Sequence, residues 1–261
     1  MKHGFCHLSH VAVRFDPSQS SEMVNQLLFG ETFEILESIN NWKLIRGSLD
    51  QYEGFVEEKQ VLLLDEKEWM SLSGETVYFS SDIVSFISEV ENTNRLLIVA
   101  GSSLPGLKNH ELTVSGKKFV FHGKTFEISS ENRRQQILET TLKYLGAPYL
   151  WGGRSPFGID CSGLVQVVFK MIGIKVPRDA MYQAQTGETV NLIEEAMPGD
   201  LAFFDNNEGK IVHAGILMDQ AKIIHSSGQV RIDTIDHHGI FNANLKKYTH
   251  QLRLIKRIIP S

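Results

Sequence analysis

The chain has 261 residues, of which 42% are hydrophobic and 22% are charged, and its formal net charge is −5. This balance is that of a globular protein and excludes a disordered, collagen-like or coiled-coil chain. A mildly acidic chain lacks the basic surface that nucleic acids require, and no apolar run approaches the ~20 residues of a membrane span. We therefore expect neither a nucleic acid nor a membrane as partner, and about two domains by length.

The two cysteines, Cys6 and Cys161, are too few for a disulfide framework. The first ten residues hold three histidines and one lysine, without the apolar segment of ~7–15 residues that marks a signal peptide. The sequence therefore predicts a cytoplasmic protein, or a periplasmic or secreted one if a leader has been removed.

Short alternating apolar segments with turn residues between them fill the first part of the chain. Val11, Val13 and Phe15 alternate in this way, which indicates a short strand of a small barrel. In the stretch 41–56, a strand led by an aromatic residue, a polar turn and a Tyr-Glu-Gly-Phe-Val strand follow one another. This stretch resembles the closing strands of a bacterial SH3-like domain, and the resemblance covers about residues 8–64.

A second strand-rich segment follows. Strands are predicted over residues 76–79, 96–100, 112–115 and 118–121, and Ser115-Gly116 reads as a tight hairpin turn. We expect two small all-β SH3-like barrels, at residues 1–66 and 67–128.

From residue 129 the pattern changes to helices followed by strands. A first helix places Ile137, Leu138, Thr141, Leu142 and Leu145 on one face. A second helix begins just after Cys161 and is apolar nearly all round, so it should be central and buried. Strands are predicted over residues 201–204, 211–218, 222–225 and 252–259. Helices ahead of an antiparallel sheet predict an α+β domain over residues 129–261.

Cys161 lies between a glycine-rich loop and the predicted buried helix. A thiol at a helix N-terminus is placed where the helix dipole favours the thiolate, which lowers its pKa and helps it act as a nucleophile. The alternative is a small buried core cysteine. The small residues around Cys161 favour an accessible sulfur.

A nucleophilic cysteine needs a base, and two histidines are spaced to supply one. If residues 211–225 form a hairpin centred on Asp219, His213 and His225 lie directly opposite each other on one face. Val212, Ala214, Ile216 and Ile224 then point to the buried face. His213 would be the base and His225 the group that orients it. Each histidine alone could also be an ordinary surface or core residue.

Five motifs in order, P-Y-x-W-G-G, D-C-S-G-L-V, P-G-D-L, H-A-G-I and I-H-S-S, resemble the NlpC-type cysteine peptidases over about residues 130–261. That resemblance implies a papain-like fold and hydrolysis of bacterial cell-wall peptides. It assigns Cys161 as nucleophile, His213 as base and His225 as the third polar member. It also implies that Tyr149 faces the nucleophile and helps stabilise the oxyanion together with the backbone N–H of Cys161.

The same resemblance implies further substrate contacts. Asp160 and Ser162 would line the cleft, and Arg178 with Asp179 matches a Pro-Arg-Asp element there. The next position, often Ser in the family, is Ala180, which puts one hydrogen bond to substrate in doubt. Trp151 is expected as a cleft wall or a core residue.

Two SH3-like units ahead of such a domain resemble the γ-D-glutamyl-L-diamino-acid endopeptidases. These cleave after γ-D-Glu in released peptides such as L-Ala-γ-D-Glu-diaminopimelate, or the L-Lys form, and require a free N-terminal L-Ala. By this resemblance Glu22 is the candidate anion for the ammonium and Tyr52 its neighbour. The resemblance implies murein peptide recycling. We expect a monomer without cofactor, and without metal because the sequence has no paired metal ligands.

Three other functions compete with this one. The first is a non-catalytic SH3-like cell-wall binding protein, which the complete set of Cys161, His213 and His225 disfavours. The second is a zinc hydrolase with those three residues as ligands, but neither C-x-x-C nor H-E-x-x-H occurs. The third is a papain-like amidase or acyltransferase of other specificity, which substrate profiling alone separates.

Overall fold

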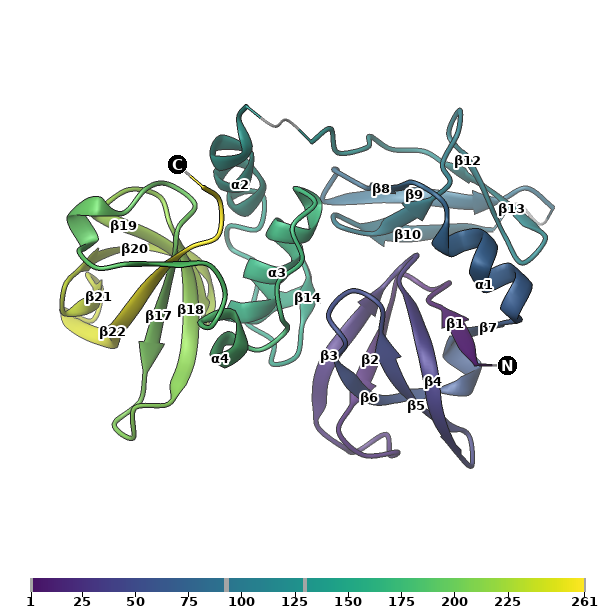
Figure 1. Cartoon of the computed structure of the whole chain (residues 1–261), viewed down its shortest axis with the longest axis horizontal. Helices are drawn as coiled ribbons and strands as arrows, with labels where there is room; N and C mark the ends of the chain where they lie inside the picture. Colours follow the sequence, from purple (N-terminus) through teal and green to yellow (C-terminus); the bar gives the residue numbers. More distant parts are fainter. Residues whose placement is uncertain (1, 92–93, 129–130, 261) are drawn as a thin grey trace. The chain divides into compact units, whose positions relative to one another are not determined.

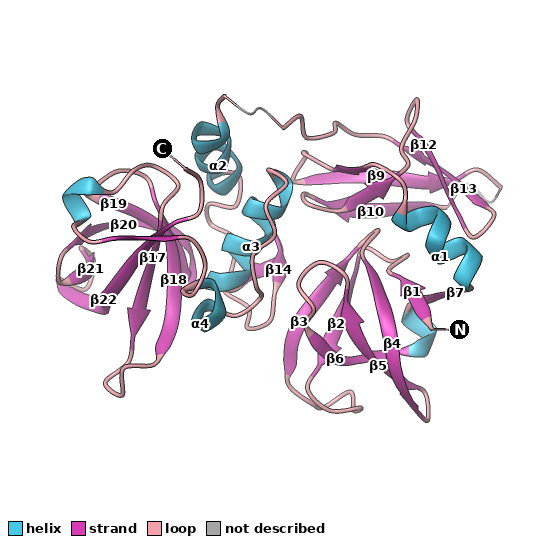
Figure 2. Ribbon diagram, in the orientation of Figure 1, coloured by secondary structure: helices cyan, strands magenta, loops and turns pink. Residues whose placement is uncertain are grey.

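A computed structural model describes residues 2–91, 94–128 and 131–260. The chain folds into two compact units. Unit 1 comprises Met1–Glu127 together with Trp151–Pro156, and unit 2 comprises Ile128–Leu150 and Phe157–Ser261. The elements of each unit are labelled in Figure 1, and Figure 2 distinguishes the helices from the strands.

Unit 1 begins with a seven-stranded antiparallel sheet in the order β3-β2-β6-β5-β4-β1-β7. Its strands are β1 (His3–Phe5), β2 (His10–Arg14), β3 (Met23–Leu28), β4 (Thr32–Ile39), β5 (Trp42–Gly47), β6 (Glu53–Glu57) and β7 (Leu62–Leu64), with a 3-10 turn at Glu58–Gln60. Val11 and Val13 point into the apolar core as predicted. Phe15 does not: it is 65% exposed, because β2 ends at Arg14 and the chain turns.

The second strand-rich segment forms a four-stranded sheet, β10-β9-β13-β12, and a two-stranded sheet, β11-β8. Its strands are β8 (Val77–Phe79), β9 (Val84–Glu89), β10 (Arg95–Val99), β11 (Ser103–Pro105), β12 (Glu111–Val114) and β13 (Lys117–Phe121). Ser115 and Gly116 both adopt positive φ, 51° and 75°, as a tight hairpin turn of the predicted kind requires. The sequence analysis did not predict helix α1 (Glu66–Ser73), which a capping box between Asp65 and Glu68 begins.

The two strand-rich segments of unit 1 share one apolar core. Phe5, Phe29 and Leu64 of the first segment pack with Ile87, Ile98 and Phe121 of the second. This shared core explains why residues 1–127 form a single compact unit. The predicted division into domains 1–66 and 67–128 stays a prediction.

Unit 2 combines helices with a second seven-stranded sheet in the order β16-β22-β17-β18-β19-β20-β21. Strand β21 also pairs with β22, so six strands close into a barrel. The strands are β16 (Glu188–Val190), β17 (Leu201–Asp205), β18 (Ile211–Leu217), β19 (Lys222–Ser227), β20 (Gln229–Asp236), β21 (Gly239–Asn242) and β22 (Lys247–Arg257). The helices are α2 (Arg133–Leu142), α3 (Cys161–Met171) and α4 (Ala180–Gln183), with a 3-10 turn at Ile193–Glu195. Short strands β14 (Arg154–Ser155) and β15 (Gly158–Ile159) belong to units 1 and 2 respectively.

Helix α3 is the central element of unit 2. Every one of its residues is buried, as its apolar sequence predicts, and it packs against β18 and β19. This arrangement of helices on an antiparallel barrel confirms the α+β prediction. The predicted apolar face of α2 is only partly right: Ile137 and Thr141 are buried, but Leu142 and Leu145 are exposed because the helix ends at Leu142.

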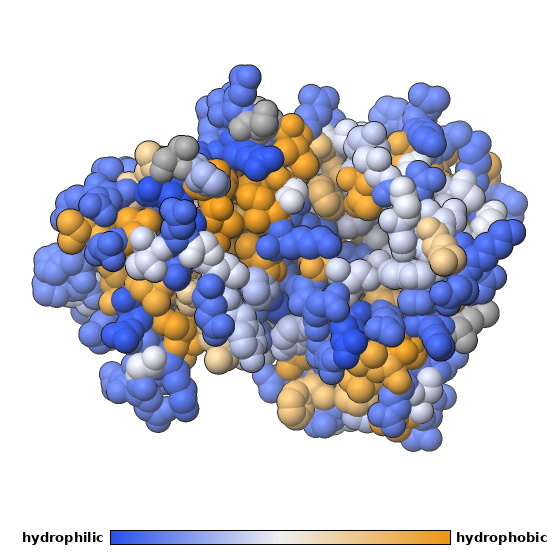
Figure 3. Space-filling model, viewed as in Figure 1, coloured by the Kyte–Doolittle hydropathy of each residue, from blue (hydrophilic) through white to orange (hydrophobic). Residues whose placement is uncertain are grey.

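None of the helices within residues 2–91, 94–128 and 131–260 combines the length and apolar character needed to cross a membrane. On the face of the molecule in Figure 3, hydrophilic residues cover much of the surface and hydrophobic residues gather in separate patches.

Candidate active site

Cys161 is the first residue of α3, and its neighbours fix the start of that helix. Asp160 is the N-cap, and its carboxylate accepts a hydrogen bond from the backbone N–H of Gly163 at 2.7 Å. Arg178 binds the same carboxylate through two nitrogens, at 2.5 and 3.0 Å, and donates to Ser162 Oγ at 2.8 Å. All of these side chains are buried, so the nucleophile sits on a rigid support.

The thiol does not have the lowered pKa that its position at a helix start predicts. Burial, followed by the nearby Asp160 carboxylate, raises the pKa of Cys161 to about 11, although backbone N–H groups and Arg178 act in the opposite direction. The expectation of a lowered thiol pKa is therefore wrong, because desolvation of the charged sulfur outweighs the helix N-terminus. The resting thiol is protonated and needs a base.

The two histidines of the predicted pair are in contact. His213 on β18 and His225 on β19 are joined by a hydrogen bond of 2.8 Å between Nε2 and Nδ1, and they are only 6% and 1% exposed. The predicted register was wrong: Gly215, not His213, lies opposite His225. A shift of two residues leaves each side chain on its predicted face, so the histidines meet diagonally.

Gly215 makes this diagonal contact possible. A Cβ at this position would lie 2.6 Å from Ile223 Cδ1 and 3.0 Å from His225 Cβ. On the opposite face Ala214, Ile216 and Ile224 are fully buried as predicted. Val212 is exposed, against the prediction, because it lies near the open end of the hairpin.

A buried carboxylate that was not predicted from the sequence lies behind the histidine pair. Asp233 on β20 is 7% exposed and accepts a hydrogen bond from His225 Nε2 at 3.1 Å and one from Arg231 at 2.8 Å. Burial alone would raise its pKa, but the hydrogen bonds from His225 and Arg231 outweigh burial and lower the pKa. Asp233 is therefore ionised at neutral pH. Its signal in the sequence was the alternation V-R-I-D, which places Arg231 and Asp233 on one face of a strand after His225.

The Asp233 carboxylate determines the proton positions along the chain of hydrogen bonds. Because an ionised carboxylate only accepts, His225 Nε2 carries a proton, and Nδ1 of a neutral His225 ring is then the acceptor. His213 Nε2 must then donate to His225, which leaves Nδ1 of neutral His213 as an acceptor. Burial, then His225 and His250, lowers the pKa of His213 well below its usual value, so this neutral form is present at pH 7.

The thiol lies within reach of this histidine strand. A backbone hydrogen bond from Ala214, the residue after His213, acts on Cys161. The Tyr149 phenol is also close to the thiol: burial first, then Cys161 and Asp160, raises its pKa to about 12. Tyr149 is therefore a neutral hydrogen-bond donor beside the nucleophile.

Some predicted substrate contacts have another structural role. Asp160, Ser162 and Arg178 are bound to one another, so they hold the helix start. Asp179 is half-buried as the N-cap residue of α4, whose first residue, Ala180, is buried.

A third histidine, also missed by the sequence analysis, borders the pair. The His250 ring on β22 stacks on His213, with ring centroids 4.2 Å apart and planes 25° apart. Burial, then His225, lowers the pKa of His250 to about 4. His213, His225 and His250 each offer a ring nitrogen, and these nitrogens lie within 4.8 Å of one another.

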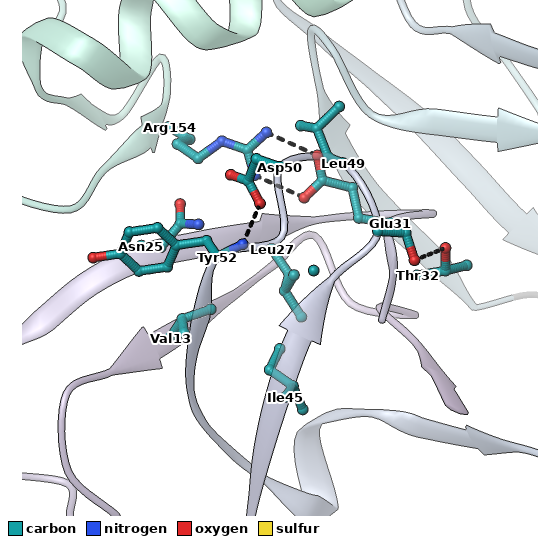
Figure 4. Close-up of a pocket in the computed structure, with 12 residues that line it drawn as sticks. Val13, Asn25, Leu27, Glu31, Thr32, Ile45, Leu49, Asp50, Tyr52 and Arg154 are labelled. Carbon is teal, nitrogen blue, oxygen red and sulfur yellow. Dashed lines mark hydrogen bonds and ion pairs between the residues drawn. The ribbon is translucent and has the colours of Figure 1, made fainter. Parts of the chain in front are cut away.

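The remaining predicted site residues, Glu22, Tyr52 and Trp151, belong to unit 1. Trp151 is 59% exposed, so it is not a core residue, and its indole Nε1 donates to Glu22 at 2.5 Å. Tyr52 lines a small pocket together with Asn25 and Asp50, as Figure 4 shows. Glu22 is not among the residues that line this pocket.

The Trp151–Pro156 segment is anchored in unit 1 by Arg154. This arginine is fully buried, binds both carboxylate oxygens of Glu31 at 2.7 and 2.8 Å, and donates to the Gln26 carbonyl (Figure 4 shows the ion pair). The backbone N–H of Arg154 also donates to the Gln26 side chain.

A buried thiol at a helix start, a neutral histidine and a buried His–Asp pair behind it are the arrangement of a cysteine hydrolase. Residues 146–251 match the NlpC/P60 family, and residues 13–61 match the bacterial dipeptidyl-peptidase Sh3 domain. The chain therefore carries an NlpC/P60 domain preceded by a bacterial SH3 domain.

Two relatives and one solved structure illustrate this similarity. Over 117 residues the chain is 42% identical to the gamma-D-glutamyl-L-lysine dipeptidyl-peptidase of Bacillus subtilis, covering 44% of this chain and 39% of that protein. It is 25% identical to dipeptidyl-peptidase 6 of Lysinibacillus sphaericus over 253 residues, 88% of this chain and 91% of the relative. The crystal structure of an NlpC/P60 family protein from Bacillus cereus shares the fold, with a TM-score of 0.82, 18% identity and coverage of 99% and 100%.

Proposed function

We propose that this protein is a cysteine endopeptidase that cleaves the bond between γ-D-glutamate and a diamino acid in cell-wall peptides with a free N-terminal L-Ala. The observation that carries the proposal is the buried Asp233–His225–His213 chain, which leaves one acceptor nitrogen on His213 for the Cys161 thiol proton. The name of the Bacillus subtilis relative supplies the substrate class, and both names describe release of a dipeptide.

The mechanism follows from the proton positions. Substrate entry brings the scissile carbonyl to Cys161, and His213 Nδ1 takes the thiol proton as the sulfur attacks. The resulting imidazolium donates through Nε2 to His225, whose own Nε2–H donates to the Asp233 carboxylate. Because these partners are already oriented, charge forms on His213 with little rearrangement.

The oxyanion of the tetrahedral intermediate needs hydrogen-bond donors. The backbone N–H of Cys161, in the first turn of α3, has no carbonyl one turn earlier to bind. The neutral Tyr149 phenol beside the thiol is the second donor. The protonated His213 then gives its proton to the leaving amine, and water attacks the thioester with His213 again as base.

In this proposal the Glu22 carboxylate binds the N-terminal ammonium group of the substrate. Glu22 is exposed, and its carboxylate accepts a hydrogen bond from the Trp151 indole N–H. The indole N–H orients one carboxylate oxygen and leaves the other to accept from an ammonium. Peptides with a free N-terminus are those already released from the wall, so the proposed role is recycling. A cytoplasmic location and a monomeric state stay predictions.

The experiment compares digestion of L-Ala-γ-D-Glu-L-Lys, its diaminopimelate counterpart and their N-acetylated forms, followed by mass spectrometry. A charge-assisted hydrogen bond contributes about 1.5–3 kcal/mol, so acetylation should lower kcat/KM about 10–150-fold. Glu22→Gln should lose most of this preference, whereas Glu37→Gln, on an exposed carboxylate of the same sheet, should keep it. Equal cleavage of free and acetylated peptides by the unmodified enzyme would overturn the specificity, and products from another bond would indicate an amidase or acyltransferase.

A further inference from the structure

His213, His225 and His250 form a cluster of three histidines. His213 Nε2 and His225 Nδ1 face each other at 2.8 Å, and the His250 ring stacks on His213. One ring nitrogen from each lies within 4.8 Å of the other two. We propose that these three nitrogens form an inhibitory binding site for a divalent transition-metal ion such as Zn²⁺.

The distances suit such an ion once the His250 ring turns out of its stack on His213, because the lone pair of an imidazole nitrogen lies in the plane of its ring. Zn–N bonds are about 2.0–2.1 Å long, so three nitrogens in tetrahedral positions lie roughly 3.3 Å apart. The 2.8 Å between His213 Nε2 and His225 Nδ1 is slightly shorter than this value, and the distances from the His250 nitrogen to the other two, which are at most 4.8 Å, can exceed it. His213 and His225 are buried, whereas His250 is half-buried and gives the cluster an edge toward solvent.

The outer nitrogens of two of these histidines already have the partners that metal ligands require. His225 Nε2 donates to the Asp233 carboxylate, which directs the lone pair of Nδ1 into the cluster. His250 Nδ1 and Thr249 Oγ1 share a hydrogen bond of 2.9 Å, which engages this ring nitrogen. When Nδ1 carries the proton, His250 Nε2 keeps a lone pair for an ion. These contacts distinguish the cluster from a chance group of histidines.

Metal binding would stop catalysis through the tautomer of His213. To coordinate the ion, Nε2 gives up the proton that it donates to His225, and this proton moves to Nδ1 through solvent. No proton is gained or lost overall. Nδ1 then carries a hydrogen and cannot accept the thiol proton of Cys161. The inhibition, unlike the binding, rests on the proposed thiol mechanism.

The competing explanation is that Zn²⁺ binds the catalytic thiolate together with His213, without His250. Calorimetric titration with ZnCl₂ separates the two, using the Cys161→Ala and His250→Phe variants in a buffer with a non-thiol reductant. The three-histidine site predicts that Cys161→Ala still binds one Zn²⁺, and that His250→Phe binds at least about 10-fold more weakly. His237→Phe, which changes an exposed histidine paired with His238, is the matched control and should bind as the unmodified protein does.

Activity provides the second measurement, with each variant compared with its own metal-free rate. Zn²⁺ should inhibit the unmodified enzyme and the His237→Phe variant, a chelator should reverse the inhibition, and His250→Phe should need about 10-fold or more metal. Loss of zinc binding in Cys161→Ala, or equal affinity of His250→Phe and the unmodified protein, would overturn the proposal. Zinc binding without any peptide cleavage would instead count against the proposed function alone.

Discussion

Replacing Asp233 by Asn tests whether the buried carboxylate fixes the protons of the histidine pair. The change keeps size and shape but replaces one acceptor oxygen by an NH₂ donor. His225 and the Nη2 nitrogen of Arg231 donate to different oxygens of this carboxylate, so an amide whose oxygen faces that nitrogen turns its NH₂ group toward His225. If the NH₂ group faces His225, that histidine must move its proton to Nδ1. His213 Nε2 then becomes an acceptor, and its proton moves to the nitrogen that should receive the thiol proton.

The size of the effect follows from the contact that is lost. Hydrogen bonds to a charged group contribute about 1.5–3 kcal/mol, which corresponds to about 10–150-fold in rate. Asp233 lies behind His225 and not against the thiol, so the loss should appear in kcat with little change in KM. Steady-state kinetics on L-Ala-γ-D-Glu-L-Lys measures both constants.

The control is Asp236→Asn, three residues further along, in the same strand. Asp236 accepts a hydrogen bond from the Tyr248 hydroxyl instead of from the histidine chain, so kcat should stay at the level of the unmodified enzyme. Thermal unfolding shows whether each variant is folded. An Asp233→Asn variant that folds and keeps its full kcat would refute the proton assignment.

Three further predictions concern the same unit. Arg178→Ala leaves the buried Asp160 carboxylate without its ion pair and should lower the free energy of unfolding by about 3–5 kcal/mol in urea denaturation; unchanged stability would contradict the role given to this pair. Gly215→Ala overpacks against Ile223, so it should destabilise the protein by about 1–3 kcal/mol and lower kcat, and a variant with normal melting temperature and kcat would refute the close-packing argument. Because the pKa of His213 is lowered, kcat/KM should fall only well below pH 6.5, where this base takes up a proton. The thiol pKa of about 11 predicts that the rate of iodoacetamide labelling of the free enzyme still rises above pH 9. A labelling rate that levels off near pH 6 would show that the resting enzyme holds a thiolate.

Local patterns in the sequence were sufficient for the elements that hold the catalytic groups. The uninterrupted apolar character of residues 161–171 predicted a buried helix, and the separation of His213 and His225 placed both on one face of a hairpin. The exact pairing was not predictable, because the turn at Met218–Ala221 sets the register. The predicted common face of His213 and His225 was nevertheless correct, because a register error of two residues leaves each side chain on the same face of its strand.

Contacts between distant parts of the chain account for most of what was missed. Strand β20 was not predicted, so Asp233 could not be placed beside His225. His250 reaches the cluster only because β22 pairs with β17 and β21. No local sequence pattern predicts this order of strands in the sheet. Likewise, the thiol pKa depends on burial by the whole of unit 2, which outweighs the local effect of the helix start.

The most direct test of thiol catalysis is rapid acid quenching of the enzyme mixed with L-Ala-γ-D-Glu-L-Lys, followed by intact mass and peptide mapping. The mechanism predicts an L-Ala-γ-D-glutamyl thioester on Cys161 in the unmodified enzyme and none in Cys161→Ala, which should also release no L-Lys. Release of L-Lys by Cys161→Ala at the rate of the unmodified enzyme would contradict the central claim.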